Sequence, residues 1–548
     1  MPASPARPAT TITSEREAYV YLQLPGTLET VPAALLRVQT LPDGTQVGRF
    51  RYGDRYLARP DAVPFDPFRL PLAKQVFEFT QLRGIPGAVR DAAPDAWGRR
   101  VIEHKLERDP ADLHEIDYLV HGPQDGAGYL SLGLKVEPPA PKRIYNRTYQ
   151  LAELIAASRA IEEGGRVAAH LLEQLDPGTS MGGARPKVTI EDDHRLWLGK
   201  FPAQGDRFNL QRVERATLDL ARRCGLNVAQ ARLQPVGSSD VLMLERFDRE
   251  HAEGGYRRFG LVSGMTVLDC GDSYLDRDRW SYPLLAENLR RWSDKPEADC
   301  AELFRRMVFN AAVTNNDDHP RNHALLRRHK GWRLSPAYDL APAPVVSLER
   351  RDLALIVGSY GRTASVYNLL SQASRFGLSG EDARWEIDRI VAVVRQWRES
   401  FLACGVSTAD IDHIAPAILP ECFSLKGGRM PEAAKRISIG AVWPWPLHTS
   451  FTHRRPVYHD GAFLQPPRAV NRTTAPVGAR RPKGPAAPPT GMHAEKRDRA
   501  SRRPRAPAEP RPSRPRRPQG RSLLASGRPW PPRPSQLRLG RSIGRAVL

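Results

Sequence analysis

The chain has 548 residues, with 82 Lys and Arg against 61 Asp and Glu, and so carries a formal net charge of +21. From Pro431 onward there are 25 basic and 5 acidic residues, which leaves 57 and 56 for the first 430 residues. Because the body of the chain is nearly neutral, its charge does not indicate a nucleic-acid binder as a whole. The length allows roughly two to four domains.

The cysteines argue against a cysteine metal site or a disulfide framework, because they lie far apart and form no CxxC pair. They are Cys224, Cys270, Cys300, Cys404 and Cys422. There is no apolar run of about eighteen residues and no basic-then-apolar start. We therefore expect a soluble cytoplasmic protein without a membrane segment.

Residues 1–17 are expected to be a flexible N-terminus. Short alternating segments such as AYVYLQL and TQVGRFRYG then predict a small strand-rich subdomain over residues 18–115. Within it, Asp91–Leu106 has a proline turn that leads into a helix. His121–Leu132 is a glycine-rich turn that enters a strand.

Residues 116–249 are expected to form a second, mixed unit. It begins with the helical pattern TYQLAELIAASRAIEE, and GTSMGGARPKVTI then runs into LWLGKFP, which predicts two strands flanking a glycine-containing turn. The helix VERATLDLARRCG and the strand DVLMLERFDR complete this unit.

Residues 250–428 are expected to be mostly helical, because YPLLAENLRRW, AELFRRMVFNAAV and ARWEIDRIVAVVRQWRESFLA have helical periodicity. WRLSPAYDL is a strand-like run that ends near Asp339. The predicted fold class is α+β: a two-lobed, protein-kinase-like fold with a small strand-rich N-terminal subdomain and a mostly helical C-lobe.

Residues 429–548 have no apolar face to bury, so a disordered, Pro/Arg-rich basic tail is expected. A basic linker or an out-of-frame extension is the favoured interpretation of such a tail, over a functional nucleic-acid arm. Aromatic residues are not regularly interleaved in it, which weakens a base-stacking role.

The first candidate site is GTSMGGARPK. Gly182, Gly183 and Ala184 leave backbone N–H groups open to approach, as in loops that cradle phosphates, and Lys187 adds a positive charge nearby. The segment matches neither GxxxxGK[ST] nor GxGxxG, so an ordinary hairpin turn is the alternative.

The second candidate is Lys200, which stands among apolar neighbours in LWLGKFP. A lysine of this kind can simply extend its amine to water. A strand lysine shortly after a glycine-rich turn is also where protein kinases keep the residue that neutralises nucleotide phosphates. Glu214, on the next helix, is expected to orient it by an ion pair.

The third candidate is the polar segment NNDDHPRNHA. Asp317 and Asn322 are separated by five positions, the interval between the base and the metal-binding amide of a kinase catalytic loop. Asp339, at the end of the following strand, is placed like a second magnesium carboxylate. Carboxylate and amide oxygens suit Mg²⁺, which completes its shell with water and ATP phosphates.

Simpler interpretations remain for the neighbours of these residues. Asp318 and His323 can be solvated loop residues, and His319 can brace the loop. Asn315 and Asn316 can cap the preceding helix. The order of glycine-rich turn, strand lysine, helix glutamate, Asp-x4-Asn and a final Asp favours a phosphoryl-transfer site.

Taken together, residues 18–428 resemble the HipA family of serine/threonine kinase toxins. The resemblance is carried by DAAPDAWGRR, GPQDGAGYL, SMGGARPK, LGKFP, VLMLERFDR, NNDDHPRNHA and LSPAYDLAP. It implies ATP and Mg²⁺ as cofactors. The residues that it implies for ATP binding are Gly182, Gly183, Ala184, Arg185, Pro186, Lys187 and Lys200, with Glu245, Arg246 and Phe247 at the adenine hinge.

For catalysis, the resemblance implies that Asp317 is the base, with His319 and Arg321 assisting near the phosphates. Asn322 and Asp339 would be the magnesium ligands. Ser180 aligns with the serine that family members autophosphorylate, and a phosphate there would repel ATP from the loop.

The resemblance also implies partners. These are a small HipB-like helix-turn-helix antitoxin, operator DNA bound through the antitoxin complex, and a protein substrate such as an aminoacyl-tRNA synthetase. Two alternatives stay open on the residues alone: a small-molecule kinase, and a catalytically idle scaffold that holds an antitoxin on operator DNA.

Overall fold

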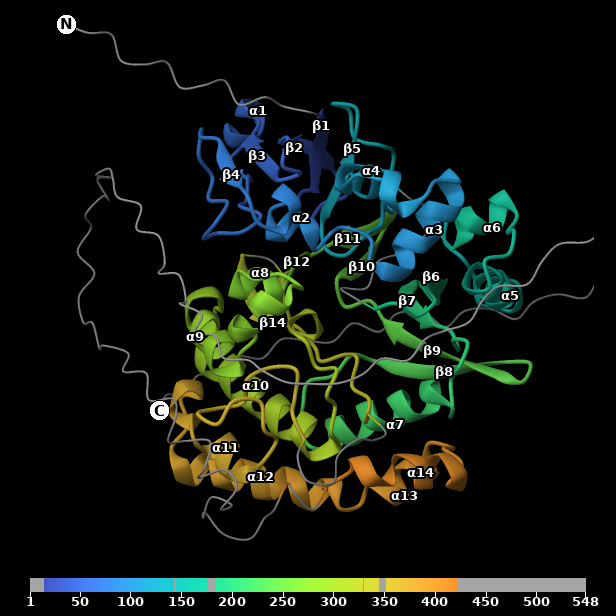
Figure 1. Cartoon of the computed structure of the whole chain (residues 1–548), viewed down its shortest axis with the longest axis vertical. Helices are drawn as coiled ribbons and strands as arrows, with labels where there is room; N and C mark the ends of the chain where they lie inside the picture. The colour runs from blue at the N-terminus through green and yellow to red at the C-terminus, as the bar shows by residue number, and fades with distance from the viewer. Residues whose placement is uncertain are drawn as a thin grey trace, which may run out of the picture. The chain divides into compact units, whose positions relative to one another are not determined.

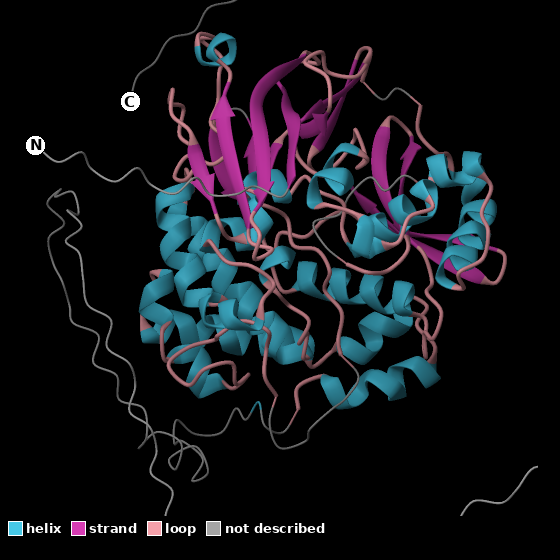
Figure 2. Ribbon diagram, turned by 45° about the horizontal axis from the view of Figure 1, so that its top comes forward, coloured by secondary structure: helices cyan, strands magenta, loops and turns pink. Residues whose placement is uncertain are grey.

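The computed structural model describes residues 14–141, 144–175, 183–328, 330–343, 351–420 and 423. In these residues the strands gather on one side and most helices on the other, as Figure 2 shows. The predicted α+β, two-lobed architecture is confirmed. The predictions for Ser180, Gly182 and the tail at 429–548 lie outside the described residues.

A five-stranded antiparallel sheet forms the N-terminal subdomain, in the order β4-β3-β2-β1-β5. Its strands are β1 (Ser14–Gln23), β2 (Thr30–Thr40), β3 (Gln46–Tyr52), β4 (Phe77–Phe79) and β5 (Leu130–Gly133). The last strand corrects the sequence prediction, which ended this subdomain at residue 115. Local patterning cannot show that a strand will pair with a partner more than a hundred residues earlier.

Short helices connect β4 to β5 and face the rest of the molecule (Figure 1). They are η1 (Leu82–Gly84), α2 (Gly87–Arg90), α3 (Ala96–Leu106) and α4 (Glu115–Val120), while α1 (Asp54–Leu57) follows β3. The predicted helix after the proline turn is α3, and Asp95 caps it by accepting a hydrogen bond from Gly98 N at 2.9 Å.

The second sheet has four antiparallel strands in the order β6-β7-β9-β8. They are β6 (Lys187–Asp192), β7 (Arg195–Lys200), β8 (Ala231–Val236) and β9 (Ser239–Glu245). The turn between β6 and β7 is Asp193-His194, both with positive φ, which suits a two-residue hairpin. The glycine-rich segment therefore precedes this pair of strands and does not join them, which corrects the sequence interpretation.

Helices cover both faces of this sheet. Val241 and Met243 of β9 pack with α5 (Leu151–Glu162), and α6 (Ala169–Gln174) lies beside it. Leu242 and Leu244, which point to the opposite face, pack with α7 (Leu210–Arg223). The alternation along β9 thus joins two helical layers through one strand.

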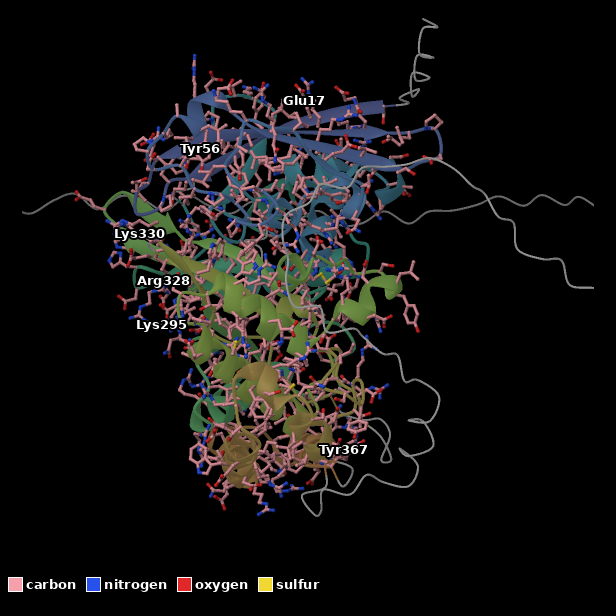
Figure 3. The ribbon with its side chains drawn as sticks, turned by 90° about the vertical axis from the view of Figure 1, so that its left-hand side faces the viewer. Glu17, Tyr56, Lys295, Arg328, Lys330 and Tyr367 are labelled. Atoms are coloured by element: carbon pink, nitrogen blue, oxygen red, sulfur yellow. The ribbon has the colours of Figure 1, made fainter. Side chains whose placement is uncertain are left out.

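The C-lobe is built around α10 (Pro296–Val313), which is buried on nearly all sides (Figure 1). The helices α9 (Tyr282–Trp292) and α12 (Gly380–Val394) pack directly against it. The other elements of residues 249–414 are β10 (Arg249–Ala252), β11 (Gly255–Arg258), β12 (Gly260–Ser263), α8 (Gly264–Leu268), η4 (Tyr274–Arg279), β13 (Ala324–Arg328), β14 (Gly331–Leu334), α11 (Val366–Leu370), α13 (Trp397–Ala403) and α14 (Thr408–Ile414). In Figure 3, Glu17 and Tyr56 mark the N-terminal subdomain and Tyr367 the opposite, helical end.

The strand expected at WRLSPAYDL is shorter than predicted, because β14 ends at Leu334. Asp339 therefore stands in a loop and not at a strand end. This loop is tied to the segment before β8, since Ala337 N donates to Asn227 O at 2.8 Å and Ala229 N donates to Ala337 O at 3.0 Å.

A buried ionic cluster joins the N-terminal subdomain to the second sheet. Asp125 accepts hydrogen bonds from Arg246 at 2.9 Å and from Arg249 at 2.9 and 3.0 Å, and Asp248 pairs with the same two arginines. Each of these four side chains is at most 7% exposed. Arg258 completes the cluster by donating to the carbonyls of residues 124–130.

Two further findings concern the described residues only. None of their helices is long and apolar enough to cross a bilayer. Their cysteines Cys224, Cys270, Cys300 and Cys404 are free thiols, and the first three are buried.

We predict that Asp125→Asn destabilises the protein by about 3–5 kcal/mol, because it leaves two buried arginines with an incomplete set of negative partners. Urea unfolding followed by tryptophan fluorescence measures the change. The control is Asp54→Asn, since the Asp54 carboxylate is 60% exposed beside Arg51. Equal unfolding midpoints for the two variants would contradict the prediction.

Candidate active site

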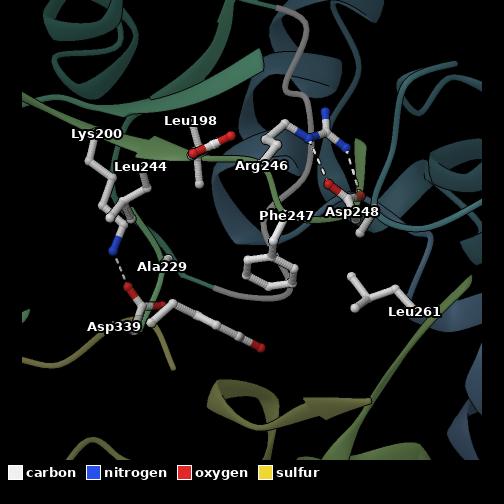
Figure 4. Close-up of a pocket in the computed structure, with 12 residues that line it drawn as sticks. Leu198, Lys200, Ala229, Leu244, Arg246, Phe247, Asp248, Leu261 and Asp339 are labelled. Atoms are coloured by element: carbon white, nitrogen blue, oxygen red, sulfur yellow. Dashed lines mark hydrogen bonds and ion pairs between the residues drawn. The ribbon is translucent and has the colours of Figure 1, made fainter. Parts of the chain in front are cut away.

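The centre of the candidate site is a lysine held between two carboxylates. Lys200 Nζ donates to Glu214 Oε1 at 2.6 Å and also contacts Asp339 Oδ1. The Lys200 and Glu214 side chains are 12% and 7% exposed, and that of Asp339 is 28% exposed. Figure 4 shows Lys200 and Asp339 meeting at one end of a pocket.

The charges of these three groups depend on one another. Burial disfavours the charged amine of Lys200, but Asp339 and Glu214 outweigh it and raise its pKa above the ordinary value. Burial likewise works against ionised Asp339, yet Lys200 holds the pKa of that carboxyl below its usual range. Burial raises the pKa of Glu214, although Lys200 opposes this. Lys200 is thus kept cationic and Asp339 anionic at neutral pH.

The α7 helix places Glu214 at Lys200. Asn209 caps this helix by accepting a hydrogen bond from Arg212 N at 3.0 Å, and Val213 and Leu220 are buried beneath it. Glu214 lies on the buried side with these apolar residues, which a carboxylate tolerates only when it is paired. The predicted ion pair between Lys200 and Glu214 is therefore present in the structure.

Asp339 reaches Lys200 from an unusual backbone conformation. Its φ is +55°, a left-handed region that side chains other than Gly, Asn and Asp rarely adopt. Asn315 Nδ2 donates to the backbone carbonyl of Asp339 at 3.3 Å and thereby links it to the end of α10. Asn315 is thus a positioning residue in this structure, as well as part of the helix end.

The polar segment after α10 forms a loop that buried side chains hold in place. Asp318 is 1% exposed, contacts Tyr282 Oη, and lies 3.0 Å from His323 Nε2. Tyr282 Oη in turn accepts a hydrogen bond from Asn310 Nδ2 at 3.0 Å. Asp318 and His323 are therefore buried anchors, and the interpretation of them as solvated loop residues is wrong.

The anchored loop leaves Asp317 exposed on its surface. Asn322 Nδ2 donates to the backbone carbonyl of Asp317 at 3.0 Å, and His319 N donates to the same oxygen at 2.8 Å. Asp317 and Asn322 are thus held together across one turn, while the Asp317 carboxylate remains open to an incoming group.

The residues present fit a magnesium ion. The Asn322 amide donates through Nδ2, so its Oδ1 is an oxygen that could bind a metal, and Asp339 offers an anionic oxygen. Among the described residues no three His, Cys, Asp or Glu side chains gather as a metal site. A site of one carboxylate and one amide, completed by water and phosphate, suits Mg²⁺ better than a metal that needs a full protein cage.

An apolar pocket opens beside Lys200 (Figure 4). Its lining residues are Ala127, Leu198, Lys200, Ala229, Leu244, Glu245, Arg246, Phe247, Asp248, Leu261, Tyr338 and Asp339. The Phe247 and Tyr338 rings lie 5.8 Å apart at 36°, which gives the pocket one aromatic wall. Flat apolar walls with polar groups at one end suit a purine ring joined to a charged tail.

The three predicted hinge residues line this pocket in different ways. Phe247 contributes its ring, as Figure 4 shows. The Arg246 side chain is instead committed to the buried cluster with Asp125 and Asp248, and Glu245 lies 3.4 Å from Arg195. Any contact that Arg246 makes with a ligand would therefore come from its backbone.

The described part of the glycine-rich loop is tied to the first turn of α3. Lys187 Nζ donates to Asp95 Oδ2 at 2.6 Å, and both side chains are 3% exposed. Trp97 Nε1 donates to Lys187 O at 3.1 Å, and Trp97 N donates to Gly183 O at 3.4 Å. Gly183 has a φ of +111°, and a Cβ there would come within 2.7 Å of Lys187 Nζ.

The remaining predicted residues lie around this loop. Arg185 pairs with Asp206, and Pro186 O accepts a hydrogen bond from Phe201 N at 2.9 Å. Ala184, His319 and Arg321 line a second, larger cavity next to the loop. Lys187 thus has a structural partner in the N-terminal subdomain, whereas Lys200 is the lysine beside the apolar pocket.

Sequence reasoning assigned no role to Asp95, Trp97, Asp318 or Tyr282. Asp95 stands directly before a helix, which signals a cap, but nothing in the local pattern signals its pairing with Lys187, 92 residues away. Tertiary contacts, such as Asp95 with Lys187 and Asp318 with Tyr282, connect these residues to the site.

Comparison with known families agrees with this geometry. Residues 179–397 match the model of the HipA-like C-terminal domain. These residues are thus similar to that domain. The match contains Lys200, Glu214, Asp317, Asn322 and Asp339, and it confirms the resemblance seen in the sequence motifs.

Three curated proteins similar to this chain are named as candidate kinases. Y4mE of Sinorhizobium fredii is 29% identical over 26% of this chain and 33% of its own length. Y4dM of the same organism is 26% identical over 42% of this chain and 59% of its own length. A Haemophilus influenzae protein is 24% identical over 32% of this chain and 56% of its own. The chain thus spans between about a third and three fifths of the relatives it matches.

A solved structure shows the same fold beyond the HipA-like domain. It is that of the toxin–antitoxin system HipA, HipB and operator DNA complex of Shewanella oneidensis MR-1. Its matched chain has a TM-score of 0.53 and 16% identity, and covers 73% of this chain and 94% of its own. The extent of the match brings the N-terminal subdomain into the shared fold.

We predict that Asp95→Ser loosens the glycine-rich loop. Serine still caps α3, but it is too short to hold Lys187, so local opening of residues 183–187 becomes easier. Hydrogen exchange measured by mass spectrometry should be about tenfold faster in peptides covering this segment.

The control is Asp109→Ala, which removes the cap of a short 3-10 turn in the same subdomain. It should leave exchange at residues 183–187 unchanged. The same protection in Asp95→Ser as in the parent protein would show that the ion pair does not hold the loop.

Proposed function

We propose that the chain is an ATP- and Mg²⁺-dependent serine/threonine protein kinase and a HipA-like toxin. The observation that carries this proposal is Lys200, kept cationic between Glu214 and Asp339 at the end of an apolar pocket. Glu214 and Asp339 satisfy the buried ammonium in this structure, and a strand lysine after a glycine-rich turn is the residue with which protein kinases neutralise nucleotide phosphates.

Each residue has a distinct task in this proposal. The adenine ring lies in the apolar pocket, and the Lys200 ammonium attracts the phosphates at its open end. Asn322 and Asp339 hold magnesium, which when bound neutralises charge on the phosphates. Asp317 accepts the proton of the acceptor hydroxyl, and its exposure lets that hydroxyl approach. Catalysis would come mainly from positioning and charge neutralisation.

Ser180 is proposed as the site of autophosphorylation. It precedes Gly183 by three positions, in the segment that resembles the family's nucleotide loop. A phosphate adds about −1.5 to −2 charges at neutral pH, which would repel ATP and displace the loop. This gives the kinase a route to its own inactivation.

The proposed partners are a HipB-like helix-turn-helix antitoxin and, through it, operator DNA. Support comes from the fold shared with a HipA that was solved with HipB and operator DNA. The proposed substrate is a protein of translation in the cytoplasm, such as an aminoacyl-tRNA synthetase. This last step rests on the family resemblance.

We predict that the full chain transfers labelled γ-phosphate from Mg·ATP to its own Ser180. Asp317→Ala should lower the rate by about 10²–10⁴-fold, because the hydroxyl loses its general base. Ser180→Ala should remove the label from the protein while leaving transfer to other proteins of a lysate. Mass spectrometry identifies the labelled residue.

Asp54→Ala, on the exposed surface of the N-terminal subdomain, is the matched control and should label like the parent protein. Absence of label on the folded chain and on every lysate protein would overturn the kinase proposal. The idle scaffold on operator DNA would then be the better account. Label on a metabolite alone would favour a small-molecule kinase.

A further inference from the structure

A second cavity, of about 690 Å³, lies between the N-terminal subdomain and the loop that carries Asp317, His319, Arg321 and Asn322. The C-lobe contributes His319, Arg321 and residues 271–273, and the glycine-rich loop contributes Gly183 and Ala184. The cavity shares no lining residue with the apolar pocket beside Lys200. The apolar pocket ends at Lys200 and Asp339, whereas the second cavity ends at the glycine-rich loop and at the loop of Asp317 and Asn322, so two substrates of a transfer reaction could occupy them separately.

Two arginine–carboxylate–arginine groups face this cavity. In the first, Arg90 and Arg321 both contact Asp272, and Arg321 Nη2 lies 2.7 Å from Asp272 Oδ2. Burial, and then the nearby Arg321, lower the pKa of Arg90, while Asp272 opposes them. Asp272 is itself 52% exposed, so a ligand can reach this group.

The second group has the same arrangement on the side of the cavity formed by the N-terminal subdomain. Arg83 Nη1 and Arg99 Nη2 each lie 2.6 Å from the Glu115 carboxylate, which is 12% exposed. The Arg83 side chain is 69% exposed, so a ligand in the cavity can reach it. Each group thus carries one positive charge in excess.

The other acidic side chains of the lining halve this excess. Asp95 is paired with the buried Lys187, and Asp276 adds a single negative charge. The lining together with Lys187 therefore keeps one positive charge in excess, while its four guanidinium groups stand as two separate pairs. Guanidinium groups at two separate places favour a ligand with separated carboxylates, each of which can accept paired N–H bonds.

Two exposed apolar side chains adjoin the lining residues of the cavity in the chain. Tyr274 and Leu275 are 83% and 88% exposed, and they lie between the lining residues Ser273 and Asp276. Large apolar side chains of this exposure beside a charged cleft are typical of a protein-binding surface.

We propose that this cleft binds an acidic segment of a protein, which carries the acceptor serine or threonine. The inference rests on the kinase activity proposed above and adds the class of its substrate. Acidic side chains flanking the hydroxyl contact the Arg90 and Arg83 groups, and apolar ones contact Tyr274 and Leu275. The hydroxyl oxygen then bonds to the γ-phosphorus while its proton passes to Asp317. The bond from that phosphorus to the bridging oxygen breaks, and ADP leaves.

The test uses the full chain and nine-residue peptides with a central serine, flanked throughout by Asp, Ala or Lys. Their phosphorylation by Mg·ATP is measured, and their binding is followed separately by fluorescence anisotropy. We expect the Asp peptide to have the highest kcat/KM. Arg83→Gln/Arg90→Gln should raise its KM about tenfold or more, with the KM for ATP unchanged.

Arg83→Glu/Arg90→Glu should shift the preference toward the Lys peptide, a change that a merely misfolded variant would not show. The control is Arg49→Gln, which removes a surface arginine that pairs with Glu78 on the N-terminal sheet. It should leave every constant unchanged. A single-stranded oligonucleotide of nine nucleotides should not compete with the Asp peptide for binding.

The outcomes separate this inference from the kinase proposal. Equal phosphorylation and binding of the three peptides would overturn the acidic cleft and leave the kinase intact. Competition by the oligonucleotide would also overturn it, in favour of a nucleic-acid ligand. Arginine-dependent binding of the Asp peptide without phosphorylation of any peptide would support the cleft and count against the kinase.

Discussion

The candidate site depends on one buried charge, the ammonium of Lys200. Its two carboxylate partners come from α7 and from the loop after β14, so both elements must be in place before the charge is satisfied. An unpaired lysine at this depth would cost several kcal/mol. The same contacts therefore stabilise the fold and align the groups expected to bind phosphate and metal.

The N-terminal subdomain contributes to this alignment through one short segment. Arg90 contacts Asp272, and Asp91 accepts hydrogen bonds from Ser263 and Thr266 at the start of α8. Asp95 then holds Lys187 of the glycine-rich loop. The buried cluster of Arg246 and Arg249 with Asp125 also holds the N-terminal subdomain against the HipA-like domain. The N-terminal subdomain therefore helps to position the loops of the candidate site.

Much of the site was accessible from sequence because it uses local patterns. The apolar alternation of DVLMLERFDR and the helical spacing of VERATLDLARRCG predicted β9 and α7, which are close to the elements observed. The interval from Asp317 to Asn322 also reflects local geometry, since one turn brings the two together. Errors arose where tertiary packing overrode the local signal: Asp318 looked solvated but is a buried anchor.

The sequence by itself determined the order of elements, the two-lobed fold class and the residue types that phosphoryl transfer needs. Periodicity and turn chemistry act over a few residues, so they can be recognised in a single chain. Only the tertiary structure decided which distant residues and strands pair. Lys200 meets Asp339, 139 residues away in the sequence, and Arg90 meets Asp272, 182 residues away. Likewise, β5 pairs with β1. Such pairings follow the path of the whole chain, because their free energy is gained only when distant segments pack together.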